Sequence, residues 1–198
     1  MSNLEETLHD GGAIIMPTET VYGIFAKALD EEAVNNVYRL KQRPKDKAMN
    51  LNIADIESIY DYAVNPPRYL DKLVSAFLPG PLTIILQASP KVPYWINSGL
   101  SSVGFRMPNH PETLAMIKKY GPLIGPSANI SGHDSGTVFK DILGQFQYNV
   151  DGIEDDSAIT GVDSTILDLS GEKATILRQG AITKEDILAI IPNLQFEV

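Results

Sequence analysis

Five basic side chains lie between positions 38 and 47, against one acid, Asp46. They are Arg39, Lys41, Arg43, Lys45 and Lys47, so these ten residues carry +4 in a chain of net charge −9. A lysine point charge beside an arginine fork, as in Lys41-Gln42-Arg43-Pro44, suits a polyphosphate. Because a residue before proline avoids the α region, we expect a helix to end near Lys41, with Lys41 and Arg43 pointing the same way on an extended exit. The alternative is a solvated basic helix end.

Two polar loops could face the same ligand. In Pro17–Gly23 the hydroxyls of Thr18 and Thr20 stand two residues apart, so both face one side if the backbone is extended. In Gly125–Gly132 small residues would let backbone N–H groups approach a phosphate or carboxylate. The alternatives are threonines that cap local backbone and an ordinary turn.

Two arginines stand at the ends of predicted strands. Arg178 lies near Gly161–Thr165 across a predicted hairpin, where it could clamp an anion or pair with a nearby acid on the surface. Arg106 follows an apolar strand, and a buried charge there needs a partner. A ligand carboxylate and a protein acid are both candidates.

Several kinds of site are excluded by composition. The chain has no cysteine, which excludes disulfides, thiolate metal sites and a cysteine nucleophile. Its three histidines are scattered, so we expect no metal site built by the protein. Neither G-x-x-x-x-G-K-[ST] nor G-x-G-x-x-G occurs. One basic focus in an acidic chain favours a local anionic ligand over duplex nucleic acid.

Interleaved patterns predict the elements that position these residues. Strands are expected at Ala13–Met16, Leu82–Leu86, Ser102–Arg106, Ser164–Leu169 and Ala174–Leu177, the last two as a hairpin. Helices are expected at Asp30–Leu40, Pro66–Phe77, Pro111–Tyr120, Thr137–Phe146 and Thr183–Ile190, the last with a capping box between Thr183 and Asp186. The class is therefore α/β with a mixed sheet.

The 198 residues fit one domain, predicted as 1–198 with a motif-bearing core of roughly 11–182. No apolar run approaches the roughly 20 residues that a membrane span needs. The polar, acidic stretch from Met1 to Asp10 is unlike a signal peptide, so a cytoplasmic protein is expected.

The order of the motifs resembles one family, the YrdC-type threonylcarbamoyl-AMP synthases, the bacterial TsaC-like proteins. The series runs Pro-Thr-Glu-Thr-x-Tyr-Gly, Lys-x-Arg-Pro, Phe-x-Pro-Gly-Pro-Leu-Thr, Arg-x-Pro, Ser-Ala-Asn-x-Ser-Gly, Ser-Thr and Arg-x-Gly. It covers roughly Gly11 to Ile182. The chain departs from the family at Lys47-Ala48-Met49 (usually Asn-Pro-Leu), at Asn52 (often His), at Gly125 (usually Ala) and at Gly136-Thr137 (usually Pro-Thr).

The resemblance implies a fold and a reaction. The fold would be a YrdC-like twisted mixed sheet flanked by helices, with a concave basic cavity. The reaction would join L-threonine, bicarbonate or CO2 and ATP into threonylcarbamoyl-AMP and pyrophosphate, for threonylcarbamoyladenosine modification of tRNA. Mg²⁺ would ride on the ATP phosphates. Partners would be transferase proteins of the TsaB, TsaD and TsaE type, with a weak contact to tRNA and none to membranes.

The resemblance also implies site residues. The positions similar to the family's threonine side are Thr20, Asn52, Arg106, Gly125 and Ser164. Those similar to its ATP side are Arg43, Lys47, Ser102, Ser127, Ser135 and Arg178. Lys41 and Asn129 complete the motifs linked to activity, so Lys41, Arg43, Ser127 and Asn129 form the expected catalytic group. Arg43, Lys41 and Arg178 would share the triphosphate charge, and Arg106 would pair with the threonine carboxylate or carbamate.

Three other functions compete with this one. A paralogue could keep the fold without synthase chemistry, but it would lack the Lys-x-Arg and Ser-x-Asn motifs. An RNA-binding module would bind RNA with steep salt dependence and independently of threonine. A domain that transfers carbamoyl groups to another acceptor would leave Thr20 and Arg106 without a task.

Overall fold

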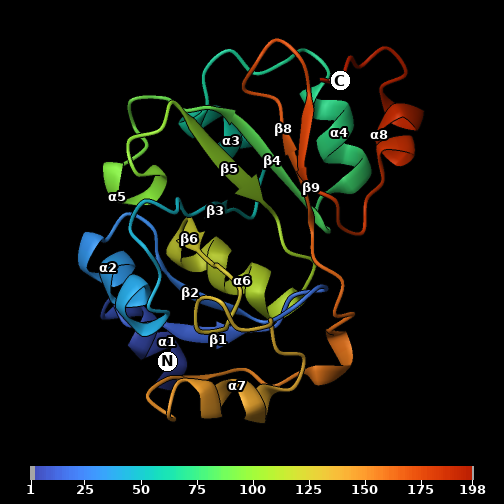
Figure 1. Ribbon diagram of the computed structural model, residues 1–198. Coiled ribbons are helices and arrows are strands. Elements are labelled where there is room, and N and C mark those ends of the chain that lie inside the picture. The colour runs from blue at the N-terminus through green and yellow to red at the C-terminus, as the bar shows by residue number, and fades with distance from the viewer. Residues whose placement is uncertain (1–2, 198) are drawn as a thin grey trace.

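The strands predicted at Ala13–Met16 and Ser102–Arg106 are both present in the computed structural model, which describes residues 3–197. They belong to one mixed, twisted sheet with helices on both faces, as expected for the α/β class (Figure 1). The sheet order is β7-β1-β2-β6-β3-β5-β4-β8-β9. The strands are β1 (Ile14–Met16), β2 (Gly23–Lys27), β3 (Leu51–Asn52), β4 (Leu82–Gln87), β5 (Ser102–Arg106), β6 (Leu123–Ile124), β7 (Asp151–Gly152), β8 (Thr165–Asp168) and β9 (Thr175–Arg178).

The pairing of the strands is both parallel and antiparallel. β1 pairs antiparallel with β2 and parallel with β7. β5 pairs parallel with β3 and antiparallel with β4. The predicted late hairpin is confirmed, because β8 pairs antiparallel with β9 and also joins β4 in parallel.

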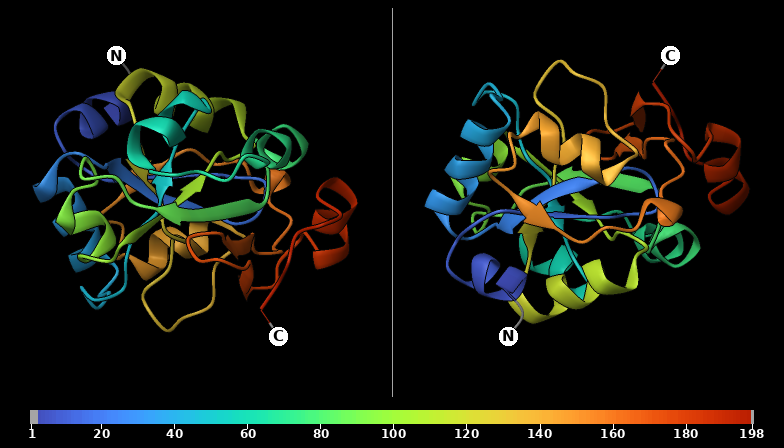
Figure 2. Two further views of the ribbon diagram at one scale, coloured as in Figure 1. Left: turned by 90° about the horizontal axis from the view of Figure 1, so that it is seen from above. Right: turned by 90° about the horizontal axis from the view of Figure 1, so that it is seen from below.

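The helices surround the sheet. They are α1 (Asn3–His9), α2 (Glu31–Leu40), α3 (Glu57–Tyr62), α4 (Leu70–Phe77), α5 (Tyr94–Asn97), α6 (Pro111–Tyr120), α7 (Phe139–Gln145) and α8 (Lys184–Ile190), with a 3₁₀ turn, η1 (Asp156–Ala158). Figure 2 shows α1 and α6 on one face of the sheet and α7 on the other. Alternate strand residues point to opposite faces, so Ile14 and Met16 pack with Leu8 and Met116, whereas Ile15 lies in the larger core.

The helix signals read from the sequence are largely confirmed. α6 has the predicted bounds, with Pro111 in its first turn. The predicted capping box of α8 is present, since Thr183 Oγ1 accepts from the Asp186 backbone N–H and the Asp186 carboxylate accepts from the Thr183 N–H. Asp30 caps α2 by accepting a hydrogen bond from the backbone N–H of Ala33.

The predicted start of the helix at Pro66 is wrong. α4 begins at Leu70, after a turn closed by a hydrogen bond from Leu70 N to Pro67 O. Pro67 keeps Pro66 out of the α region, which excludes Pro66 from the helix, and residues 68 and 69 form the turn that delays the helix to Leu70.

Some elements have no clear sequence signal. β3, β6 and β7 are two residues long, too short to show a period, and α1, α3 and α5 are also brief. The strand β2 begins at the end of the Pro17–Gly23 loop and was not predicted.

The predicted domain boundaries stay predictions, and residues 1, 2 and 198 lie outside the described residues. Within residues 3–197, no helix is both long and apolar enough to cross a bilayer.

Candidate active site

A cavity of about 180 Å³ opens where the loop between β1 and β2, the segment from α2 to β3, and the ends of β5, β6, β8 and β9 meet. Its charged lining residues are Arg43, Arg106, Arg178 and Asp163. The volume lies below the roughly 300–1,000 Å³ typical of sites for drug-sized ligands, so it suits a small polar molecule, and a nucleotide would extend beyond it. Three arginines against one aspartate support the predicted basic character, which stays a prediction.

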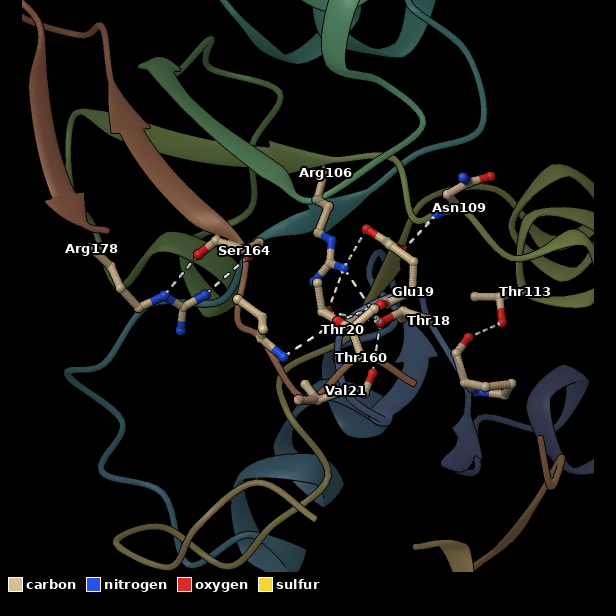
Figure 3. Close-up of polar contacts among 12 residues, drawn as sticks. Thr18, Glu19, Thr20, Val21, Arg106, Asn109, Thr113, Thr160, Ser164 and Arg178 are labelled. Atoms are coloured by element: carbon tan, nitrogen blue, oxygen red, sulfur yellow. Dashed lines mark hydrogen bonds and ion pairs between the residues drawn. The ribbon is translucent and has the colours of Figure 1, made fainter. Parts of the chain in front are cut away.

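Arg106 stands at the end of β5 and is held by the β1–β2 loop (Figure 3). Its Nη2 donates to Thr20 Oγ1 at 2.7 Å, to Glu19 Oε1 at 2.9 Å and, more weakly, to Thr18 Oγ1 at 3.3 Å. Glu19 Oε2 accepts from the backbone N–H of Asn109 at 2.8 Å. Of the two partners that the sequence left open for Arg106, the structure contains the protein acid.

The hydroxyls of Thr18 and Thr20 are 3.0 Å apart, so both do face one side as the spacing predicted. They also hold the local backbone, since Thr18 Oγ1 donates to Val21 O and accepts from Thr20 N. Thr20 is buried behind the guanidinium of Arg106 and is not among the residues that line the cavity.

Arg43 is held by carbonyl groups of its own loop. Its Nε donates to Lys47 O at 3.2 Å and its Nη2 to Ala48 O at 2.8 Å. Burial lowers the pKa of the Arg43 guanidinium from its ordinary value. Because carbonyls carry no charge, Arg43 brings a full positive charge to the cavity.

Lys41 is buried, with 1% of its surface exposed, and does not line the cavity. Its Nζ donates to Ser127 O at 2.5 Å, to Asn129 O at 2.6 Å and to Asn129 Oδ1 at 3.4 Å. Burial, and then the charge of Arg43, lower the pKa of Lys41 to about 7. Lys41 thus ties the end of α2 to the loop that follows β6.

The expected extended exit from α2 is wrong, although the helix does end next to Lys41. Lys41 keeps a helical φ of −80° and ψ of −9°, and Gln42 has a φ of +50°. The left-handed residue reverses the chain, so Lys41 reaches the 127–129 loop whereas Arg43 reaches the carbonyls of residues 47 and 48.

The loop after β6 is fixed from within and from β2. Ala128 N donates to Tyr22 O at 2.7 Å, and Ser127 Oγ donates to Asn129 Oδ1 at 2.5 Å. The Asn129 amide donates to the carbonyls of Ile130 and His133. Ser127 therefore lines the cavity, while Asn129 is buried and shapes the loop.

Arg178 is anchored on Ser164, the residue directly before β8 (Figure 3). Its Nε donates to Ser164 O and its Nη2 to Ser164 Oγ, both at 3.0 Å. Asp163 is a more distant partner, with 3.8 Å between its carboxylate and Nη1. Gly180 permits this close packing, since a Cβ there would lie 2.2 Å from Asp163 O.

Two positions that depart from the family pattern are neighbours in the structure. A Cβ on Gly125 would lie 2.4 Å from the ring of Phe25 and 2.8 Å from Asn52 Nδ2. Asn52 is buried and donates weakly to Leu123 O at 3.4 Å. Both residues line the cavity, so the two departures affect one wall.

The structure brings together only part of the predicted site. The predicted residues that line the cavity are Arg43, Asn52, Arg106, Gly125, Ser127, Ser164 and Arg178. Those that do not are Thr20, Lys41, Lys47, Ser102, Asn129 and Ser135. Lys47 is exposed, and its carbonyl oxygen accepts from Arg43. Ser102 lies at the opposite end of β5 from Arg106.

Four further residues belong to the site although the sequence did not single them out. Tyr22 lines the cavity, and its hydroxyl donates to Asp156 and accepts from Asp155 N. Burial and the Asp156 contact raise the pKa of Tyr22, which keeps the phenol neutral. Glu19, Thr83 and Asp163 lie inside motifs already recognised, and this membership was the available signal.

Comparison with known proteins gives consistent matches. The family model Sua5_yciO_yrdC, described as "Telomere recombination", matches residues 6–180. The threonylcarbamoyl-AMP synthase of Pyrococcus abyssi is 38% identical over 193 residues, covering 95% of this chain and 56% of the relative. That of Bacillus subtilis is 38% identical over 187 residues, covering 93% and 54%.

A solved structure matches equally well. The crystal structure of P. abyssi Sua5 complexed with L-threonine superposes with a TM-score of 0.92 at 35% identity, covering 98% of this chain and 58% of that one. The chain therefore spans about half the length of the curated relatives it matches.

Proposed function

This chain belongs to the Sua5/YciO/YrdC family, and on that basis we propose that it is an L-threonylcarbamoyladenylate synthase, a nucleotidyltransferase. It would form threonylcarbamoyl-AMP and pyrophosphate from L-threonine, bicarbonate or CO2, and ATP. The observation that carries the proposal is the convergence of Arg43, Arg106 and Arg178 on one small cavity. The relatives' names and the threonine complex of P. abyssi Sua5 support the choice of substrates.

The two ends of the cavity suit different ligands. Arg43, Arg178 and Ser127, which all line the cavity, offer charge and hydrogen-bond donors to phosphates. Arg106, with Asn52, offers a site for the carboxylate and hydroxyl of threonine. Ser164, expected on the threonine side, is hydrogen-bonded to Arg178 and so adjoins the phosphate group as well.

The chemistry needs no nucleophile from the protein. The threonine amine attacks CO2, and a carbamate forms with loss of a proton, or it attacks bicarbonate, and the carbamate forms with loss of water. A carbamate oxygen then attacks the α-phosphorus of ATP, and the bond to the pyrophosphate leaving group breaks. The protein positions the reactants and stabilises charge at the phosphates through Arg43 and Arg178.

The donor set fits Mg²⁺ carried by the nucleotide rather than by the protein. Among residues 3–197 no group of three or more histidine or acidic side chains could hold a metal. Asp163 is the one carboxylate in the described cavity lining, and it could supply a single ligand. When bound, the ion would neutralise phosphate charge.

The expected roles of Lys41 and Asn129 change with their positions. Both would act by fixing Ser127: Lys41 donates to its backbone carbonyl, and Asn129 accepts from its side-chain hydroxyl. Lys47, Ser102 and Ser135 would contact ATP only where the nucleotide extends outside the cavity. The proposed consumers of the product are TsaB-, TsaD- and TsaE-type proteins in the cytoplasm, with a weak tRNA contact.

The test is pyrophosphate release from ATP with bicarbonate and Mg²⁺, with and without L-threonine. We expect release to require threonine, with serine a several-fold poorer substrate because one buried methyl contributes about 0.8 kcal/mol. The Lys91→Ala variant is the control, since Lys91 pairs with Asp61 on the exposed surface. If the protein is folded and binds ATP but releases no pyrophosphate in response to threonine, a non-synthase paralogue is favoured. If it binds RNA independently of threonine, with an affinity that falls steeply as salt is raised, an RNA-binding module is favoured.

A further inference from the structure

Glu19 gives Arg106 a close, mostly buried counter-ion, whereas Arg178 has only a more distant and more exposed one in Asp163. The carboxylate and guanidinium are 2.9 Å apart, and their side chains are only 17% and 14% exposed. The second carboxylate oxygen is held by Asn109 N, and the backbone carbonyl of Glu19 accepts from the Thr160 hydroxyl at 2.9 Å (Figure 3). Glu19 is therefore fixed at three points.

These contacts leave a defined part of Arg106 for a ligand. Nη2 has two hydrogens, and Glu19 and Thr20 accept the shorter bonds from it. Nε is buried and has no hydrogen-bond partner among the described residues, so it is closed to a ligand in the cavity. All the side-chain hydrogen bonds of Arg106 to the described residues come from Nη2, which leaves Nη1 to meet a ligand. A ligand carboxylate would thus meet a guanidinium whose orientation is already set.

The charges of the three arginines also differ. Within residues 3–197, Arg43 has no carboxylate within 4.0 Å and is held by two carbonyls. Arg178 is 3.8 Å from Asp163, with both side chains over 40% exposed. Only the Arg106 end contains a close, mostly buried, charge-neutral pair. An anion of several charges gains less there than at Arg43, because Coulomb attraction scales with the net charge of the site.

We propose that Glu19 is a positioning and specificity-determining residue that reserves the Arg106 end for the single carboxylate of an α-amino acid and disfavours polyphosphate there. The inference rests on the proposed function, since it assigns that reaction's amino acid and triphosphate to different arginines of the cavity. Glu19 acts through Arg106 and has no contact with the reacting atoms.

The test compares Glu19→Gln with the unaltered chain. The amide keeps the size of the side chain but removes its charge and one of its two acceptors. We expect threonine binding, measured by calorimetry, to weaken about 10-fold, which equals about 1.4 kcal/mol. Inorganic pyrophosphate, used alone as a probe, should bind about 10-fold more tightly and should begin to compete with threonine.

Asp61→Asn is the matched control, because it removes one carboxylate from an exposed pair far weaker than Glu19–Arg106. Glu19→Asp keeps the charge and should retain the discrimination against pyrophosphate while threonine binding weakens. A purely structural role would lower the melting temperature of Glu19→Gln without changing pyrophosphate affinity, and that result would overturn the proposal.

The two proposals fail separately. Absence of threonine-dependent pyrophosphate release from the unaltered chain would reject the synthase. Unchanged pyrophosphate affinity in Glu19→Gln would reject the role of Glu19, whether or not the chain is a synthase.

Discussion

The Arg43 end and the Arg106 end of the cavity each present one arginine, but the two guanidiniums are held by different chemistry. Arg43 donates to backbone carbonyls of the loop that follows α2. Arg106 donates to a carboxylate and two hydroxyls of the loop between β1 and β2. Uncharged acceptors fix the first arginine without cancelling its charge, whereas Glu19 cancels the charge of the second.

The difference explains how one small cavity could sort two anionic substrates. A triphosphate carries several negative charges and is drawn to the uncompensated arginine. An amino-acid carboxylate gains from geometry, because its charge-assisted hydrogen bond to a fixed guanidinium depends on the orientation of that group. Because all three cationic residues are arginines, the discrimination between the two anions depends on the hydrogen-bond partners that each arginine has within the protein.

The largest expected effect comes from removing the uncompensated charge. Arg43→Ala should lower kcat/KM for ATP about 100-fold or more, since a fixed cation at developing phosphate charge commonly contributes that much. Threonine binding should change less than threefold. Pyrophosphate release at varied ATP measures the effect, with a thermal melt to monitor folding. Normal activity in the folded fraction, together with a large loss of stability, would show that Arg43 is structural.

Arg106→Gln should produce the opposite pattern. Loss of a hydrogen-bonded charge should weaken threonine binding about 10- to 100-fold, with ATP binding changed little. The substitution also leaves Glu19 as an uncompensated, mostly buried carboxylate, so stability should fall. Adding Glu19→Gln to Arg106→Gln should recover part of that stability in a double-mutant cycle. Equal weakening of ATP and threonine would contradict the separation of the two ends.

Lys41 should make the free energy of unfolding depend on pH. Its pKa is about 7 in the folded chain, below the roughly 10.4 of an unfolded lysine. Between these values the unfolded chain binds a proton that the folded chain does not. The free energy of unfolding, relative to Lys41→Met, should therefore rise with pH from about 7 to 10, by at most about 1.4 kcal/mol per pH unit, and stay flat below 7.

Urea unfolding of both proteins from pH 6 to 10 measures this slope. The three oxygen acceptors around Nζ oppose the shift, because they bind the ammonium form best. If the difference in the free energy of unfolding between the unaltered chain and Lys41→Met does not change up to pH 9, these acceptors keep Lys41 protonated. Arg43→Ala should move the rise to higher pH, since the charge of Arg43 contributes to the lowered pKa.

The smallest effect on catalysis is expected at Gly125. Alanine there would meet Phe25 at 2.4 Å, so we expect Gly125→Ala to lower stability by about 1–3 kcal/mol through overpacking, with activity at saturating threonine within twofold. Gly144→Ala is the control, since a Cβ in that helix would meet nothing closer than 4.0 Å. Chemical denaturation measures both. Unchanged stability in Gly125→Ala would show that Phe25 can move aside.

The fold was predictable where elements are long or carry end signals. Pro111 and the Thr183–Asp186 pair marked their helices because capping is a local interaction. Two-residue strands such as Leu51–Asn52 were missed, since pairing with β5 and β6 creates them and no local period does. The start of α4 was misplaced because a turn closed by Leu70 N and Pro67 O precedes the helix, and no signal in the sequence was read for that turn.

The candidate site was predictable as a set of residue types but less so as an arrangement. The sequence correctly indicated that Arg106 needs a partner and left open an acid of the protein. Lys41 and Arg43 were expected to act together, yet a left-handed residue between them sends their side chains to different loops. Local spacing cannot anticipate such a reversal at a non-glycine residue.

By itself, the sequence determined the α/β class, the family and the presence of arginines at strand ends. Hydrophobic period and helix caps act over a few residues, and the order of the motifs is read directly along the chain. Only the tertiary structure decided which partner each cation receives. Glu19 meets Arg106 across 87 positions, and Lys41 meets Asn129 across 88. Such pairs form because burial makes an unpaired charge costly, and which residues are buried together depends on packing of the whole chain.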